Sequence, residues 1–110
     1  MESGAKLYVV VRADLAPGLQ IPQAMHAHRE FAEQHHVLER AWYRASNTLA
    51  VLSVPHERAL LALVARAQDA EVPHALFREP DLGHAATAAC LAPGAAARGL
   101  CKRLPLALKV

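Results

Sequence analysis

Aromatic residues, cysteines and net charge are all scarce in this 110-residue chain. Aromatic residues make up 5% of it, so the base-stacking platform of RNA-recognition modules is not expected. A net charge of +2 excludes the wholesale coating of a polyanion, as histone-like proteins achieve it. Cys90 and Cys101 are the two cysteines, too few for a disulfide framework, and we interpret both as reduced thiols.

The chain also lacks a long hydrophobic run. The longest stretch of low charge, residues 85–97, is too short to span a bilayer and is interrupted by Pro93-Gly94. The first residues are acidic, and the apolar run Leu7–Val11 is too short for the core of a signal peptide. The sequence therefore predicts a soluble, cytoplasmic protein without a membrane partner.

What the chain does have is apolar residues, with 54% hydrophobic content, much alanine and a mean hydropathy of +0.12. This composition argues against disorder, and the length predicts one domain over residues 1–110. Nine of the twelve basic residues are arginine, so the low net charge still leaves room for a local anion-binding site.

Apolar periodicity and turn residues divide the chain into alternating strands and helices. Strands are predicted at Leu7–Val11, Thr48–Val54, His74–Arg78 and Ala86–Leu91. Helices are predicted over about residues 18–34, with Pro22 in the first turn, and over 37–45, 55–70 and 95–100; residues 104–110 are a candidate edge segment. The order β-α-α-β-α-β-β-(α) indicates an α/β domain with right-handed crossovers. Ligands of such sheets bind beyond the carboxyl ends of the strands, and residues 12–18 and 78–83 hold most of the polar chemistry there.

The first of these turns leads into a helix. Gly18 at a strand-to-helix turn exposes backbone N–H groups at a helix N-terminus, which is a natural anion site. Gln23 and His26, three residues apart, share one face of that helix and point back toward the site. Surface solvation explains the two polar residues equally well.

The second turn holds Glu79, Asp81 and Gly83, and Thr87 begins the next strand. Carboxylates at a strand end can position a water molecule or a ligand hydroxyl. The alternative is a plain turn in which Arg78 pairs with the acidic residues.

Other chemistry finds little support in the sequence. The seven histidines do not follow the spacing of a zinc site, and neither a nucleophile elbow nor a phosphate loop occurs. Cys90 lies in an apolar strand and is predicted to be a core residue. No metal is therefore expected.

The motifs of the chain follow one another in a set order: Tyr8–Leu15, Gly18 followed by Gln23-Ala24-Met25-His26-Ala27, Trp42, Thr48–Val54, the helix with Leu60, Leu63 and Ala67, and the segment from Thr87 to Pro93-Gly94. Taken together, they resemble the archaeal- and eukaryotic-type family of peptidyl-tRNA hydrolases. The resemblance implies a mixed four-stranded sheet flanked by helices on both faces, commonly in a homodimer. It also implies hydrolysis of the ester that joins a peptide to the 3′ ribose of tRNA, with peptidyl-tRNA as substrate and no cofactor.

Two departures from the family pattern stand out. Leu19 follows Gly18 where the family usually has a lysine, and residues 79–83 replace its Asp-Ala-Gly loop. The chain therefore resembles a divergent bacterial or phage-type branch.

On this hypothesis, the catalytic candidates are Gln23, His26, Asp81 and Thr87. Gln23 and His26 orient the terminal ribose, the carbonyl or the attacking water, Asp81 orients water or accepts a proton, and Thr87 donates a hydrogen bond. Glu79 is the alternate to Asp81 and a candidate substrate contact.

The candidate substrate contacts are completed by Arg12, Arg44 and Arg78 for tRNA phosphates and Gly18 for close backbone approach. Two other functions remain open: a non-catalytic module that binds tRNA or a protein on the same fold, and a small-molecule enzyme or regulatory domain that holds a different anion near Gly18.

Overall fold

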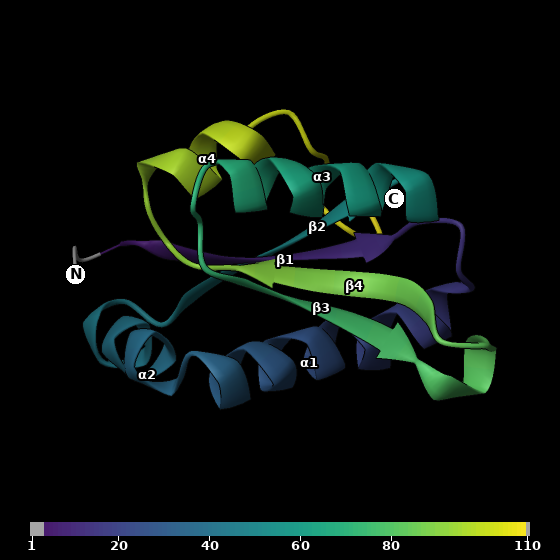
Figure 1. Ribbon diagram of the computed structural model, residues 1–110, viewed down its shortest axis with the longest axis horizontal. Coiled ribbons are helices and arrows are strands. Elements are labelled where there is room, and N and C mark those ends of the chain that lie inside the picture. The colour runs from purple at the N-terminus through teal and green to yellow at the C-terminus, as the bar shows by residue number, and fades with distance from the viewer. Residues whose placement is uncertain (1–3, 110) are drawn as a thin grey trace.

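Four strands form one mixed sheet with two helices on each face in the computed structural model, which describes residues 4–109 (Figure 1). The elements are β1 (Lys6–Arg12), α1 (Pro17–Gln34), α2 (His36–Ala45), β2 (Thr48–Val54), α3 (Glu57–Asp69), β3 (His74–Glu79), the 3-10 turn η1 (Pro80–Leu82), β4 (Ala85–Leu91) and α4 (Ala95–Cys101). The predicted fold class and element order are confirmed.

The strand order in the sheet is β2-β1-β4-β3. β1 is parallel to β2, whereas β4 is antiparallel to both β1 and β3. The strands β1, β2 and β3 therefore run in one direction, and their carboxyl ends meet at the same edge of the sheet. That edge lies on the right in Figure 1, together with η1 and the beginning of α1.

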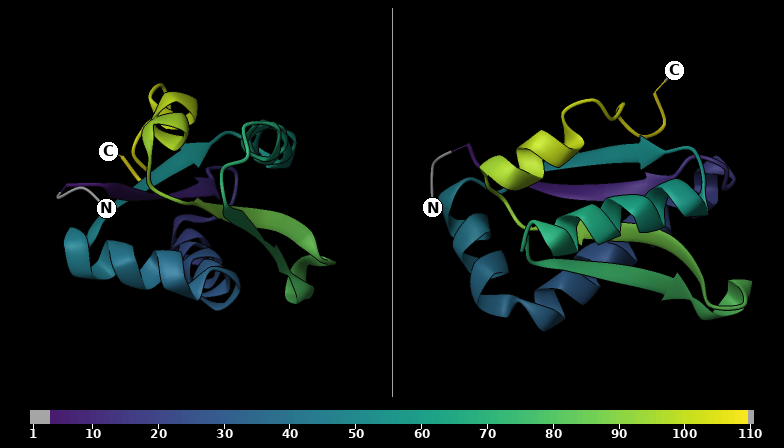
Figure 2. Two further views of the ribbon diagram at one scale, coloured as in Figure 1. Left: turned by 60° about the vertical axis from the view of Figure 1, so that its left-hand side comes forward. Right: turned by 45° about the horizontal axis from the view of Figure 1, so that its top comes forward.

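The central strand β1 is buried on both faces because helices cover both sides of the sheet. Leu7, Val9 and Val11 pack with Phe31 and Trp42 under α1 and α2. Tyr8 and Val10 belong to the opposite cluster, under α3 and α4. The two layers are visible in both views of Figure 2. This two-sided burial explains the unbroken run of apolar residues in β1, which a strand with one wet face would not show.

The helix α1 begins slightly earlier than expected. It starts at Pro17, so Pro22 falls in its second turn rather than in the first. Proline at the first position lacks only an N–H that no helix partner would accept. Pro22 inside the helix leaves the carbonyl of Gly18 without its usual donor four residues later.

The C-terminal segment adds one antiparallel bridge to the edge of β2, between Leu52 and Leu106, instead of a full strand. The backbone N–H groups of Ser53 and Ala107 complete it by donating to the carbonyls of Pro105 and Val51. Val110, the end of the predicted edge segment, lies outside the described residues. Within residues 4–109 we find no helix with the length and apolarity to cross a membrane.

Both cysteines are free and buried. Cys90 lies in the core as predicted, and burial raises its pKa far above the usual thiol range. Burial also raises the pKa of Cys101 to about 11. Neither group has the thiolate character that a nucleophile requires.

Candidate functional site

A chain of hydrogen bonds connects α1, β3 and β4 at the edge where the strand carboxyl ends meet. The Thr87 hydroxyl donates to Oε1 of Gln23 over 2.6 Å, and Nε2 of Gln23 donates to Oε1 of Glu79 over 2.9 Å. Gln23 is 1% exposed and Thr87 is fully buried, whereas Glu79 is half-buried. The two buried residues therefore fix the carboxylate of Glu79 from beneath and leave it facing the surface.

Thr87 reaches α1 because β4 contains a bulge. Phe77 pairs with Ala88 and Arg78 pairs with Ala86, so Thr87 is the extra residue between these pairs. Ala88 packs in the core cluster on the α1 side, and Thr87 bonds to α1 as well. Two consecutive side chains thus point to the same side of the sheet, which a regular strand does not allow.

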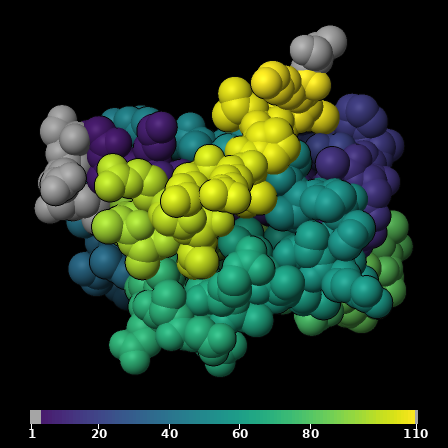
Figure 3. Space-filling view, turned by 90° about the horizontal axis from the view of Figure 1, so that it is seen from above, coloured from purple at the N-terminus to yellow at the C-terminus, as the bar shows by residue number. Residues whose placement is uncertain are grey.

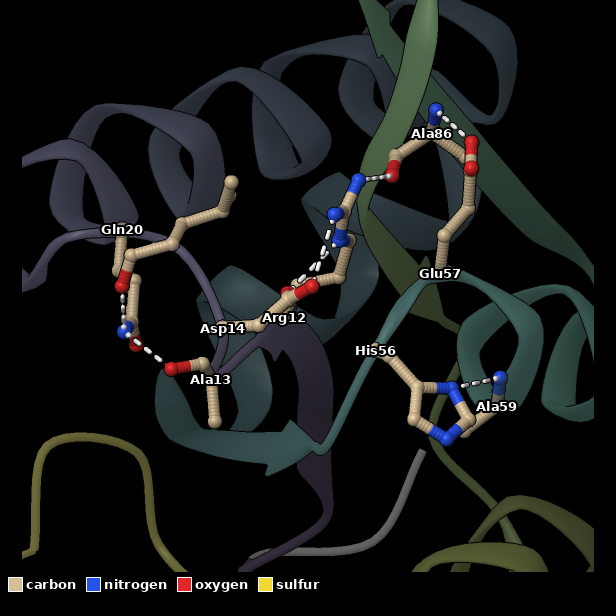
Figure 4. Close-up of polar contacts among 9 residues, drawn as sticks. Arg12, Ala13, Asp14, Gln20, His56, Glu57, Ala59 and Ala86 are labelled. Atoms are coloured by element: carbon tan, nitrogen blue, oxygen red, sulfur yellow. Dashed lines mark hydrogen bonds and ion pairs between the residues drawn. The ribbon is translucent and has the colours of Figure 1, made fainter.

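The peptide groups next to the bulge are held by two charged side chains (Figure 4). Nη1 of Arg12 donates to the carbonyl of Ala86 over 3.1 Å, and a carboxylate oxygen of Glu57 accepts from the N–H of Ala86 over 2.8 Å. The Nε and Nη2 atoms of Arg12 both bond to the carboxylate of Asp14 at 2.9 Å. We call these contacts the Ala86 clamp, which joins β1 and α3 to the bulge that positions Thr87.

Replacing Glu57 by alanine is expected to weaken the clamp. The N–H of Ala86 would lose its acceptor at a buried residue, at a cost of about 1–3 kcal/mol. Loss of an acidic residue from the first turn of α3 would add roughly 0.3–1 kcal/mol. Urea unfolding measures the sum. Glu57→Gln is the matched control, because it keeps an acceptor oxygen and should recover most of the loss. Equal losses in the two variants would contradict the clamp.

Two further predicted residues, His26 and Asp81, lie beside Glu79. His26 is exposed and stacks on Phe77 of β3, with ring centroids 4.7 Å apart. The backbone N–H of Asp81 donates to Oε2 of Glu79 over 3.3 Å, while the Asp81 side chain is exposed. The solvent-facing part of the site therefore contains an imidazole and two carboxylates.

The hydrogen bond from Gln23 holds the pKa of Glu79 below its ordinary value of 4.5. The N–H of Asp81 and the nearby His26 act in the same direction, and partial burial opposes them. Since the ionised carboxylate accepts these bonds more strongly than the protonated acid does, Glu79 stays charged to lower pH in the folded protein than in the unfolded chain.

This lowered pKa predicts how stability changes with pH. Its contribution is present above the unfolded pKa and is lost as the pH falls through the lower, folded pKa. Glu79→Gln should therefore show a smaller loss of unfolding free energy between neutral pH and pH values below 4.5. Urea titrations across this range measure the difference, with the exposed Asp69→Asn as control. Parallel pH profiles of wild type and Glu79→Gln would disprove the linkage.

The remaining predicted residues are not all brought together. Arg78 is exposed next to Glu79 and donates to the carbonyl of His84 over 3.3 Å, so it does not simply pair with the acidic residues of its turn. Gly18 is exposed in the first turn of α1. Arg44 lies near the end of α2, close to the amino end of β2 and thus at the other end of the sheet.

The family model of peptidyl-tRNA hydrolase PTH2 matches residues 5–109 of the chain. The chain belongs to this family. A matching solved structure is a protein of unknown function from Agrobacterium tumefaciens strain C58. It is 15% identical, with a TM-score of 0.68 over 93% of this chain and 96% of that chain. That likeness concerns the fold alone. No curated protein matches the chain.

Several histidines of this PTH2 chain each contact a different protein group and do not face one common metal position. His28 pairs with Glu39 at 3.1 Å, His35 contacts the carbonyl of His74, and His56 caps α3 by accepting from the N–H of Ala59. Among residues 4–109, no three His, Cys, Asp or Glu side chains gather as metal ligands would.

Glu57 and Gln20 were not anticipated from the sequence of this PTH2 member. Glu57 follows Pro55-His56 in the first turn of α3, where an acidic residue is expected because it stabilises a helix N-terminus. Its additional bond to β4 therefore has no signal of its own in the sequence. Gln20 is buried and donates to the carbonyls of Leu15 (2.7 Å) and Ala13 (3.4 Å), which ties the β1–α1 loop to the helix (Figure 4).

Proposed function

We propose that the protein hydrolyses the ester bond of peptidyl-tRNA and releases free tRNA and peptide. Membership of the PTH2 family supports this reaction class. The observation that favours a specific site is the Glu79 carboxylate, which buried Gln23 and Thr87 support at the common carboxyl edge of three strands. In sheets of this kind, ligands bind at such an edge.

In the proposed reaction, Glu79 orients the attacking water molecule and draws its proton. The water oxygen adds to the ester carbon, and the bond from that carbon to the ribose oxygen then breaks. The ribose oxygen takes up the proton that Glu79 drew from the water, which restores the carboxylate, and the peptide leaves with a free carboxyl group. His26, exposed beside Glu79, is the group that we assign to the substrate carbonyl or the terminal ribose.

The other candidates take supporting roles in this proposal. Gln23 and Thr87 position Glu79, because both are buried and already bonded to each other. Arg12 positions the bulge through the Ala86 clamp, since three of its nitrogen atoms already have acceptors. Asp81 holds Glu79 through its backbone, so the order expected from the sequence is reversed: Glu79 takes the water-orienting role and Asp81 becomes the alternate carboxylate.

Substrate contacts fall to exposed groups around the site. Arg78 and the backbone near Gly18 are the proposed contacts for the phosphate next to the terminal ribose. Leu19 stands on the same helix face as Gln23, four residues earlier, and provides no positive charge. We therefore propose that the developing oxyanion is stabilised by His26 or by backbone N–H groups.

The test is to incubate the purified chain with peptidyl-tRNA and to follow the release of free tRNA. We expect release above the buffer rate at micromolar protein. Release no faster than in buffer alone would reject the hydrolase.

A second candidate function is a tRNA-binding module that has lost hydrolysis. The observation in its favour is that Leu19 stands where the family usually has a lysine. It predicts tRNA binding that weakens with salt, without turnover. The variant Leu19→Lys separates the two candidates: if it gains hydrolysis that the wild type lacks, the module has lost activity through this position.

We also propose that the protein is cytoplasmic, as its sequence predicts, and that it forms a homodimer, as the family resemblance implies. An exposed apolar surface supports a second copy as the occupant: Ile21, Met25 and Leu49 stand beside a groove of about 290 Å³ that Leu108 also lines.

Sedimentation measurements are expected to give the mass of two chains, and Met25→Asp should shift the equilibrium toward one chain. Arg29→Asp, exposed on the same helix and outside the groove lining, is the control. A wild-type mass of one chain at all concentrations would contradict the dimer.

A further inference from the structure

A second concave surface lies on the opposite face of the sheet from Gln23 and Thr87. It is a groove of about 720 Å³ between the beginnings of β1 and β2, α4 and the C-terminal segment. Figure 3 views this face, where the beginning of β1 (purple), α4 (yellow-green) and the C-terminal segment (yellow) are gathered. The volume is in the range of sites that bind small molecules.

The groove exists because small residues occupy the places where larger ones would fill it. Ala50 of β2 pairs with Tyr8 of β1 in the floor, and Gly94 and Ala95 form one wall at the start of α4. The longer helix α3 runs along the other part of this face and does not contribute to the groove lining (Figure 2).

The charge of the groove is of one sign. Lys6, Arg98 and Lys102 line it and are exposed, and none of its lining residues is Asp or Glu. None of the three cations forms an ion pair with another residue in the described range 4–109. Three uncompensated positive charges in one groove exceed the net charge of +2 on the whole chain.

Tyr8 adds a hydrogen-bond donor to the floor. Its side chain is 8% exposed, and its hydroxyl has no hydrogen-bond partner within residues 4–109. Burial raises the pKa of Tyr8. The nearby charge of Arg98 lowers the same pKa, but by less than burial raises it, so the phenol stays protonated at neutral pH next to this guanidinium. Leu52, Leu104 and Leu106 make the rest of the lining apolar.

We propose that this groove binds a small organic phosphate ester. The phosphate dianion lies against Lys6, Arg98 and Lys102, and the organic part covers the leucines. A dianion matches several cations better than a single carboxylate does, and the apolar lining favours an ester over inorganic phosphate. The proposal is independent of the hydrolase, because the groove lies at the amino end of β1 while Arg12 and the Ala86 clamp lie at its carboxyl end.

The test uses the full chain and three probes: adenosine monophosphate, hexyl phosphate and inorganic phosphate. In titrations followed by amide NMR, we expect at least one ester to saturate and to bind about tenfold more tightly than inorganic phosphate. The shifted signals should come from Tyr8 and α4, and not from Gln23 or Thr87. The better ester indicates whether the organic part is a nucleoside or an alkyl chain.

Two variants make the test specific to the groove. Arg98→Gln should weaken the binding of the ester about tenfold, whereas Arg58→Gln, exposed on the same face in α3, should not. Ala50→Leu should weaken it by filling the floor without a change in charge.

The proposal would be overturned by no saturation by either ester at millimolar concentration, by equal affinity for inorganic phosphate, or by equal weakening by Arg98→Gln and Arg58→Gln. Binding of tRNA without binding of either ester would overturn it as well.

Discussion

The variant Glu79→Gln should lose about a hundredfold or more in the rate of peptidyl-tRNA hydrolysis, the usual range for a lost general base. The physical reason is the position of the carboxylate. One oxygen accepts from Gln23 and the other from the N–H of Asp81, so the group has one orientation toward solvent. An amide at this position keeps the shape but removes the charge and the ability to accept a proton from water.

Asp81→Asn changes the neighbouring carboxylate, which keeps its backbone contact to Glu79. If Glu79 orients the water, the hydrolysis rate of Glu79→Gln in single-turnover assays is much lower than that of Asp81→Asn. The reverse order would move the role to Asp81, and full activity in both variants would reject the site.

Replacing Gln23 by methionine is expected to reduce the rate about tenfold, in the way that loss of a positioning group does. Methionine keeps the length and approximate volume of glutamine, so the packing of α1 on β3 should survive. Both hydrogen bonds disappear, however, and the buried Thr87 hydroxyl loses its acceptor, at a cost of about 1–3 kcal/mol of stability.

Gln20→Met is the matched control for this variant. Gln20 is the other buried glutamine of α1, and it bonds to the loop before the helix instead of to Glu79. We expect it to lower stability but to leave the rate per folded molecule within about threefold of wild type, because it removes no contact to Glu79. Equal losses of rate in the two variants would show that general loosening of α1, and not the bond to Glu79, controls the activity.

Much of the fold could be predicted from local sequence. The apolar run of β1 indicated a strand covered on both faces, and the spacing of polar and apolar residues placed the helices to within a few residues. Gln23 and His26 were assigned to one helix face from their spacing alone, and both contact β3. Period and turn chemistry are local properties, so a single sequence contains them.

The bulge at Thr87 was beyond such reasoning. It depends on how β4 pairs with β3, and the clamp that holds it joins Glu57 to Ala86, 29 positions away. No periodicity encodes such a pair. The same limit applies to Arg44, which was chosen for its charge, whereas the parallel register of β1 and β2 places it at the far end of the sheet.

The burial of Gln23 also changes the account of its role. From the sequence, surface solvation explained this residue as well as a site did. At 1% exposure it is instead an interior amide with partners on two strands. Such a buried polar network is costly unless its members are bonded, and here the Gln23 amide is bonded on both sides and holds the half-buried carboxylate of Glu79 in place.

The role of Glu79 in hydrolysis is tested by the release of tRNA from peptidyl-tRNA by the wild-type chain and by Glu79→Gln, purified side by side. The Glu79→Gln protein serves as the blank for any contaminating hydrolase. We expect release by the wild type well above the buffer rate and release by Glu79→Gln close to it. Release at the same rate by both proteins, or by neither, would rule out Glu79 as the group that orients water for this reaction.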